Sequence, residues 1–482
     1  MRAVLVDAVL AFNWFVLGYF LALNSTYLVL TVVAALEFGH HLRRAGFSGQ
    51  QDLFDNPLTP PVSVLVPAYN ERAGIVQSVH AMLALRYPEF EIVVVDDGST
   101  DDTFEVLREA FDLVQVPRVL PRTVPTIGKV LSTHQPRDGS PLLVVRKDNA
   151  GRRSDPLNVA INAAQYPLIV MVDADSLLDE AALLRVAQPF VDDPGRVVAT
   201  GGVVRAANGS LVSRGRIVRT LLPRGWVARI QVVEYLRSFL LGRTGWSKLE
   251  GLLIISGAFG MFRRDLVVEV GGLDLETLAE DAELVARLHR HLRGQRRDYR
   301  VVFVSEPVCW TEVPSDLRTL ARQRLRWSRG LAEVLAKHWR MIGNPRYGRI
   351  GLVTLPYYLL FELLGPVVEV LGVIAVPLSF VLGIINLPFA IAFALVAVGY
   401  GVLLSIAAVA VEEFSYHRYQ RWRDLLTMAL AAALENLGFR QLHAWWRLRG
   451  LVRYLRRAEH SWGAMPRTGF AGVGAGEDRP EA

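Results

Sequence analysis

Two carboxylates that lie two positions apart, Asp173 and Asp175, follow the apolar run Leu168–Val172. Two carboxylates at this spacing can bind Mg²⁺ or Mn²⁺, and such an ion neutralises the phosphates of a bound nucleotide. A cap for the helix expected over 178–190 would explain Asp175 or its neighbour Ser176, but it would not explain Asp173. The sequence therefore predicts a divalent metal site at Asp173 and Asp175.

Two further polar clusters also follow strand-like runs. Val62–Val66 is followed by Pro67–Glu71, which reads P-A-Y-N-E, and Glu91–Val95 is followed by Asp96–Ser99, which reads D-D-G-S. Ligands of open parallel sheets bind beyond the C-terminal ends of the strands, so three clusters on one edge indicate a binding site. Each cluster alone could be only a turn, because such turns favour Asp, Asn, Ser and Gly. No G-x-G-x-x-G follows a strand and no P-loop motif occurs, so a dinucleotide fold and a P-loop enzyme are not indicated.

Strand signals alternate with helical spacing over residues 60–315. This alternation predicts an α/β domain with a mixed, mostly parallel sheet covered by helices on both faces. The stretch 117–141 is rich in Pro, Gly and Thr, so we expect a loop insertion there. The expected strands cover 62–66, 91–95, 142–145 and 168–172, and the expected helices cover 71–85, 157–164 and 178–190, with another from about 101.

The composition favours a soluble domain fused to membrane segments. Of the 482 residues, 51% are hydrophobic and 21% are charged, and the net charge is +6. A basic excess fits either nucleic acid or a membrane surface, but here the arginines flank apolar runs, which favours the membrane. The chain has one cysteine, Cys309, so it forms no intramolecular disulfide and fits a reducing compartment.

An N-terminal transmembrane helix is expected within residues 1–45. The run Ala8–Leu36 carries no charge and is long enough to span a bilayer. Arg43 and Arg44 follow it, and the positive-inside rule then places residues 60–315 in the cytoplasm, on the inner face of the plasma membrane.

A second apolar block covers residues 350–412 and predicts two more spans. Glu369 lies inside the first of these spans, and we expect it to face protein or a cavity because a carboxylate is costly in lipid. The expected spans cover 360–382 and 388–411, and the residues that break the block are Pro377, Asn386 and Pro388.

Arginine-rich helices are expected on either side of this block. Residues 316–349 have the charge density of a helix that lies on the membrane surface, and so do residues 420–460, although the latter could instead form one more span. The tail 466–482 is small and polar, so we expect it to be disordered.

Taken in order, these motifs resemble those of the family 2 glycosyltransferases. The likeness runs from about Pro61 to Gly330 and is greatest to the processive membrane branch, which includes hyaluronan, chitin and cellulose synthases and, closest, bacterial poly-β-1,6-N-acetylglucosamine synthases. The resemblance implies a GT-A fold, that is, a nucleotide-diphospho-sugar transferase domain, together with transmembrane and interfacial helices.

The activity that the resemblance implies is inverting transfer from a UDP-sugar, expected to be UDP-N-acetylglucosamine, to a growing β-linked polysaccharide. The expected partners are the donor, the polymer, membrane lipids and a small membrane or export protein, with secretion through the spans and no nucleic acid. One alternative is a non-processive transferase that acts on a lipid, and another is a membrane scaffold that binds nucleotide without catalysis.

The resemblance also assigns roles on the donor side. Tyr69 is similar to the residue that stacks on uracil, and Asp97 to the carboxylate that hydrogen-bonds the base. The family lysine near this site is replaced by arginine, and one extra residue is present, so either Arg152 or Arg153 is expected to contact phosphate. The full expected donor set is Tyr69, Glu71, Asp96, Asp97, Arg152, Arg153, Asp173 and Asp175.

The expected catalytic residues are Glu280 and Asp281, which resemble the family T-E-D motif with Ala279 in place of the threonine. Asp281 would be the base, and its position at the start of a helix favours the charged form that a base requires, although an ordinary acidic first turn has the same pattern. Ser256–Gly260 is expected to be the strand below the acceptor. The expected acceptor contacts are Gln323, Arg326 and Trp327 of Q-x-x-R-W, and Trp310, for which a packing role is equally open.

Overall fold

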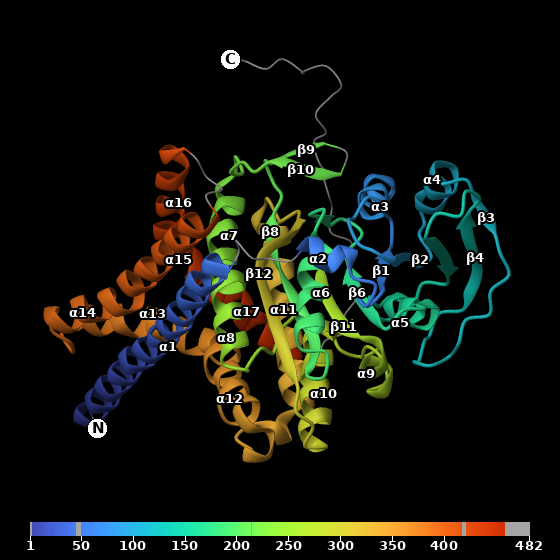
Figure 1. Ribbon diagram of the computed structural model, residues 1–482. Helices are drawn as coiled ribbons and strands as arrows, with labels where there is room; N and C mark the ends of the chain where they lie inside the picture. The colour runs from blue at the N-terminus through green and yellow to red at the C-terminus, as the bar shows by residue number, and fades with distance from the viewer. Residues whose placement is uncertain (1, 45–49, 214, 417–420, 458–482) are drawn as a thin grey trace, which may run out of the picture. The chain divides into compact units, whose positions relative to one another are not determined.

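The computed structural model describes residues 2–44, 50–213, 215–416 and 421–457 (Figure 1). These form two units: a helical unit within residues 1–46, 224–251 and 314–459, and an α/β unit within residues 47–223 and 252–313. The expected tail 466–482 lies outside the described residues.

The α/β unit is built on a ten-stranded mixed sheet with the order β3-β4-β5-β2-β1-β6-β11-β8-β12-β7. The pairings place β1, β2, β3, β5, β6, β8 and β12 in one direction, and β4, β7 and β11 in the other, so the sheet is mostly parallel as predicted. The strands are β1 Val62–Ala68, β2 Phe90–Asp96, β3 Leu113–Gln115, β4 Val130–Pro136, β5 Leu142–Lys147, β6 Leu168–Val172, β7 Leu177–Leu178, β8 Val197–Ala206, β11 Phe259–Arg263 and β12 Arg300–Thr311; β9 Leu211–Ser213 and β10 Arg216–Arg219 form a separate hairpin.

Helices cover both faces of this sheet, because its central strands are apolar on both sides. Val64 of β1 is in one buried cluster with Ile75 of α3 and Val186 of α6, whereas α5 packs against β1 and β2. Leu65 is also fully buried although it points to the face opposite Val64. The helices of this unit are α2 Gln50–Asp55, α3 Ile75–Leu83, α4 Thr103–Ala110, α5 Ser154–Ala163, α6 Ala182–Asp192, α9 Arg264–Glu269 and α10 Glu280–Gly294.

Two local predictions differ from this sheet. The expected loop 117–141 contains the strand β4, which reads V-L-S-T-H-Q-P and pairs with β5 and β3. The strand was not predicted because its sequence is polar. Polar residues are tolerated in β4 because it lies near the sheet edge, where its residues are partly exposed. The strand expected over 256–260 is a turn as far as residue 258, and β11 begins at Phe259.

The helical unit contains residues 224–251, which fall inside the range expected for the α/β domain. Of their helices, α8 contacts α1 and α7 contacts α16, and both partners belong to the helical unit. The elements are α1 Arg2–Arg44, α7 Trp226–Tyr235, η2 Leu236–Gly242, α8 Arg243–Lys248, α11 Leu317–Lys337, η3 Trp339–Met341, η4 Pro345–Tyr347, η5 Ile350–Thr354, α12 Leu355–Tyr357, η6 Tyr358–Leu363, α13 Gly365–Val381, α14 Leu387–Ala394, η7 Leu395–Gly399, α15 Tyr400–Tyr416, α16 Trp422–Leu434, η8 Glu435–Phe439 and α17 Arg440–Leu455.

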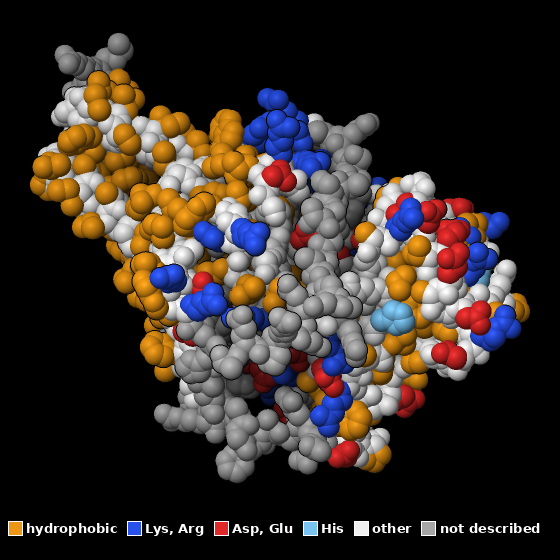
Figure 2. Space-filling view, turned by 90° about the horizontal axis from the view of Figure 1, so that it is seen from above, with side chains coloured by type: hydrophobic (Ala, Val, Ile, Leu, Met, Phe, Trp, Pro, Cys, Tyr) orange, Lys and Arg blue, Asp and Glu red, His pale blue; other side chains and the backbone are white. Residues whose placement is uncertain are grey.

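Two helical stretches among the described residues, 4–39 and 387–415, are long and apolar enough to cross a membrane. A third crossing is possible if the pair 350–363 and 365–381, bent by 41°, is one span. Hydrophobic side chains gather over the part of this unit built from α1, α13 and α14 (Figure 2). Pro377 does not break the block, because it lies inside α13, whereas Asn386 caps α14 by accepting from the Phe389 N–H at 3.0 Å.

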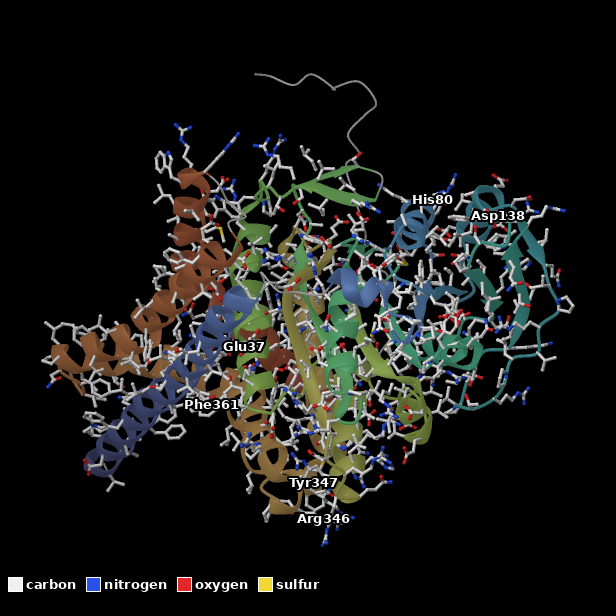
Figure 3. The ribbon with its side chains drawn as sticks, in the orientation of Figure 1. Glu37, His80, Asp138, Arg346, Tyr347 and Phe361 are labelled. Atoms are coloured by element: carbon white, nitrogen blue, oxygen red, sulfur yellow. The ribbon has the colours of Figure 1, made fainter. Side chains whose placement is uncertain are left out.

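The carboxylate predicted to avoid lipid does face protein. Glu369 of α13 accepts from Arg440 of α17 at 2.8 Å, and Glu362 of η6 accepts from Arg447 of α17 at the same distance. Phe361 lies beside α1, with its ring centre 5.2 Å from that of Tyr19 (Figure 3). Ion pairs therefore connect α13 and η6 to α17. Each pair gives a partly buried carboxylate the cationic partner that a charge away from water needs.

Candidate active site

The first two predicted clusters meet at the C-terminal edge of the sheet. Strands β1 and β2 are parallel neighbours in which Ala68 lies opposite Asp96. The Asn70 N–H donates to Ser99 Oγ at 3.0 Å, and Asn70 Oδ1 accepts from the Thr100 N–H at 2.8 Å. Asn70 has a φ of 56°, a conformation that asparagine tolerates better than most residues. The two loops are thus joined into one surface beside β6.

A buried ion cluster supports the residue expected to read the base. Lys147, at the end of β5, is fully buried and pairs with Asp97 and, at 2.8 Å, with Asp155. Asp155 also accepts from the N–H groups of Ile127 and Gly128. Burial, offset in part by Lys147, raises the pKa of Asp97 to about 6. Sequence reasoning missed Lys147, although a lysine that ends an apolar strand is itself a signal of a buried partner.

The remaining residues of the expected base site differ in exposure. The Tyr69 ring is 43% exposed, so a flat ligand could stack on it. Asp96 is buried and accepts from the Ser99 N–H at 3.1 Å, which is a role within the turn. The Glu71 N–H donates to Thr103 Oγ1 at 2.9 Å, and this bond fixes the loop before α3.

One arginine connects the predicted metal site to the predicted catalytic pair. Arg153 Nε donates to Asp173 Oδ1 at 3.1 Å, and its Nη2 donates to the same oxygen. Its Nη1 donates to Glu280 Oε1 at 2.5 Å, and its Nη2 also reaches the Gly257 carbonyl at 2.9 Å. Burial raises the pKa of Glu280, an effect that Arg153 opposes and Asp281 reinforces.

Asp281 is held at the start of α10 by two backbone donors. Its Oδ2 accepts from the Gly257 N–H at 2.9 Å, and its Oδ1 accepts from the Ala282 N–H at 2.8 Å. These two bonds hold the Asp281 side chain in one orientation. Gly257 therefore binds Arg153 through its carbonyl and Asp281 through its N–H, which brings four of the predicted residues into one network.

The two arginines left open by the sequence have different surroundings. Arg152 donates to the Leu275 carbonyl, whereas Arg153 makes the carboxylate contacts. Both line a small recess together with Gly151, Thr277 and Glu280.

The oxygen-only pair Asp173 and Asp175 fits a divalent ion that arrives with a diphosphate. Both side chains are partly buried beyond β6, in a turn closed by the Ser176 N–H and the Asp173 carbonyl at 3.0 Å. Over the part of the chain that the structure describes, no group of three or more His, Cys, Asp and Glu side chains could hold a metal ion. Mg²⁺ is commonly bound by one or two carboxylates together with substrate phosphates and water, so two aspartates suffice.

Comparison with known proteins places this site in a family. The family model described as "Glycosyltransferase like family 2" matches residues 60–330, which is more than half of the chain and includes every site residue described above. The chain belongs to this glycosyltransferase family. A solved structure, the mannosyltransferase PcManGT from Pyrobaculum calidifontis in complex with GDP-Man and Mn²⁺, is similar with a TM-score of 0.50 and 22% identity, covering 88% of this chain and 99% of that one. This likeness supports the GT-A fold.

Two curated relatives have a more specific name. The poly-beta-1,6-N-acetyl-D-glucosamine synthase of Staphylococcus aureus (strain COL) is 29% identical over 278 residues, which is 57% of this chain and 56% of that protein. The synthase of the same name from Staphylococcus epidermidis is 26% identical over 320 residues, or 66% and 64%. The match therefore spans little more than half the length of the first relative.

The expected acceptor residues of this glycosyltransferase lie in two places. Trp310 is only 3% exposed and packs with Leu177, Ala207 and Val212 in the α/β unit, which favours its packing role. Gln323, Arg326 and Trp327 lie on α11 of the helical unit, where the Trp327 ring is 37% exposed. The Arg324 guanidinium lies 4.4 Å from the centre of that ring and donates to Glu234 at 2.8 Å. Arg324, the first x residue of Q-x-x-R-W, thus packs against Trp327.

Proposed function

We propose that this glycosyltransferase polymerises a sugar from a UDP-sugar, with UDP-N-acetylglucosamine as the expected donor, into a β-linked polysaccharide. The observation that carries the proposal is the network in which Arg153 joins Asp173 to Glu280 and Gly257 joins Arg153 to Asp281. The network connects Asp173, a predicted metal ligand of the donor site, to Asp281, the predicted base. The names of the two relatives support the choice of sugar and linkage type.

On the donor side, the ring of Tyr69 would stack on the base and Asp97 would accept its N–H. The Arg153 guanidinium presents a planar fork of donors that suits phosphate oxygens. Asp173 and Asp175 would hold Mg²⁺ or Mn²⁺, and a bound divalent ion neutralises the diphosphate and assists its departure as UDP.

On the acceptor side, Asp281 would act as the base. It takes the proton of the attacking hydroxyl while the hydroxyl oxygen forms a bond to the anomeric carbon and the bond from that carbon to the diphosphate oxygen breaks. Attack on the face opposite the leaving group inverts the configuration, and an α-linked donor therefore yields a β-linked product. Trp327 would offer an aromatic face to the acceptor chain.

The setting that we propose is the plasma membrane, with the α/β unit in the cytoplasm. The two to three candidate spans support a membrane-bound enzyme, and secretion of the polymer through them, with or without a small export partner, belongs to the same proposal. The second candidate is transfer of one sugar to a lipid, which the same donor site could perform.

A donor screen followed by product sizing tests this function. Purified full-length protein would be given radiolabelled UDP-N-acetylglucosamine, UDP-glucose or GDP-mannose with Mg²⁺ or Mn²⁺. The proposal expects a long ladder from UDP-N-acetylglucosamine that β-specific hydrolase digests. A single lipid-soluble spot would establish the second candidate, and release of free nucleotide from none of the donors would refute both.

A further inference from the structure

We propose that Arg153 is a positioning residue that keeps the metal ion from binding at Asp173 until a donor diphosphate is present. The inference rests on the proposed function for the nature of the donor. It concerns the order of binding, which neither the family nor its relatives' names specify. It follows from how completely Asp173, Glu280 and the Gly257 carbonyl engage the Arg153 guanidinium.

Arg153 engages one of the two oxygens that Asp173 could offer to a metal ion. Its Nε and Nη2 both donate to Asp173 Oδ1, so this oxygen receives a forked contact from one guanidinium. Hydrogen bonds between two ionised groups are stronger than those between neutral groups. A divalent ion that approaches Asp173 alone must compete with this contact for the carboxylate and must also lie beside a permanent positive charge.

The other contacts of Arg153 hold the guanidinium in place. Only 11% of its side chain is exposed, and it also bonds Glu280 and the Gly257 carbonyl. A Cβ atom on Gly257 would lie 2.8 Å from Arg153 Nη1, so only glycine leaves room for this approach. A guanidinium is not deprotonated in proteins, so the positive charge of Arg153 is permanent.

A diphosphate changes this balance. Its oxygens accept from a guanidinium at least as well as a carboxylate does, and its negative charge offsets the repulsion between Arg153 and the ion. Arg153 can then turn from Asp173 to phosphate while Asp173 turns to the metal. Because Gly257 links Arg153 to Asp281, the position of the candidate base is coupled to the same exchange.

The test is Mn²⁺ binding to the full-length protein in detergent, followed by electron paramagnetic resonance with and without UDP. In the wild type, UDP should tighten Mn²⁺ binding at least about tenfold, the equivalent of one charge-assisted hydrogen bond. In Arg153→Gln, Mn²⁺ alone should bind about tenfold more tightly than to the wild type, and the gain from UDP should shrink. Arg153→Lys should be intermediate, because an ammonium is a single point charge and not a fork.

Two controls make the result specific. Asp173→Asn should remove Mn²⁺ binding in either background, which locates the ion. Arg264→Gln should keep the wild-type dependence on UDP, because Arg264 lies outside the proposed site and donates to the Ile161 carbonyl at 3.2 Å. If Arg153→Gln does not fold, Gly257→Ala displaces the same guanidinium and is measured in its place.

The proposal is overturned if Mn²⁺ alone binds Arg153→Gln no more tightly than it binds the wild type. A purely structural role for Arg153 predicts that outcome together with a lower melting temperature and weaker Mn²⁺ binding in all states. Failure of UDP to bind the wild type would instead contradict the proposed function, and the measurement with Mn²⁺ alone still decides the role of Arg153.

Discussion

Replacement of Asp281 by asparagine tests the assignment of the base most directly. Both carboxylate oxygens accept backbone N–H groups, from Gly257 at 2.9 Å and from Ala282 at 2.8 Å. An asparagine has one oxygen and one NH₂ group, so it can accept only one of these bonds. The substitution therefore removes the base. It also places the asparagine NH₂ group, a donor, opposite one of the two backbone N–H groups.

The two effects differ in size and in where they appear. Loss of a general base costs about 10²- to 10⁴-fold in kcat. The opposed donors cost about 1–3 kcal/mol of stability, because a buried N–H is left without an acceptor. We therefore expect kcat to fall by about 10²- to 10⁴-fold and the melting temperature to fall slightly. The Kd for UDP should stay within about threefold, because the two residues bound to Asp281 are not predicted donor ligands.

The assay combines sugar transfer, calorimetric UDP binding and thermal unfolding in detergent. Asp138→Asn is the matched control, since Asp138 lies on the exposed turn between β4 and β5, accepts from the Ser140 N–H at 2.9 Å and should leave all three measurements unchanged (Figure 3). A kcat within tenfold of wild type would refute the base assignment. Equal losses of transfer and UDP binding would refute it as well, because they would mean that the substitution had damaged the donor site.

Three further predictions concern charged groups. Lys147→Met should destabilise the α/β unit by about 3–5 kcal/mol, because it leaves buried Asp97 without its cation, and an unchanged melting temperature would argue against that pairing. Because the pKa of Asp97 is raised to about 6, this carboxyl takes up a proton as the pH falls below 6. UDP affinity should drop roughly tenfold from pH 7 to pH 5, where about one molecule in ten keeps the charged form, and calorimetry should show no such drop for Asp97→Asn. Glu369→Gln leaves Arg440 without its carboxylate and should lower the melting temperature in detergent; adding Arg440→Gln should restore part of the loss, and no recovery would count against the ion pair.

The parts of the fold that could be predicted are those whose local pattern agrees with their burial. Strands β1, β2 and β6 are mostly apolar and almost entirely buried, so their positions are evident from the residues alone. Strand β4 has a polar sequence, and only its pairing with β5 defines it. Pro377 indicated a break, yet helix α13 continues through it. Tertiary packing therefore decided the cases in which the local pattern was weak or misleading.

The site shows the same division. Asp173 and Asp281 could be proposed because their motifs are local. The carboxylate contacts of Arg153 could not, because they depend on Gly257, a residue about a hundred positions away whose missing side chain admits the guanidinium. Spacing along a chain cannot reveal such a contact, and the added residue in this loop made even the spacing ambiguous.

The electrostatic balance of the site explains why an ion should enter with the donor and not before it. The site holds four acidic side chains, Asp173, Asp175, Glu280 and Asp281, and Arg153 pairs with the first and third of them, although the chain as a whole is basic with a net charge of +6. A diphosphate that approached alone would add further negative charge to this cluster, and a lone metal ion would have to compete with Arg153 for Asp173. The nucleotide and the ion together avoid both costs, because the ion neutralises the phosphates and the phosphates accept the guanidinium. A cluster so arranged favours the complete donor complex over either of its parts.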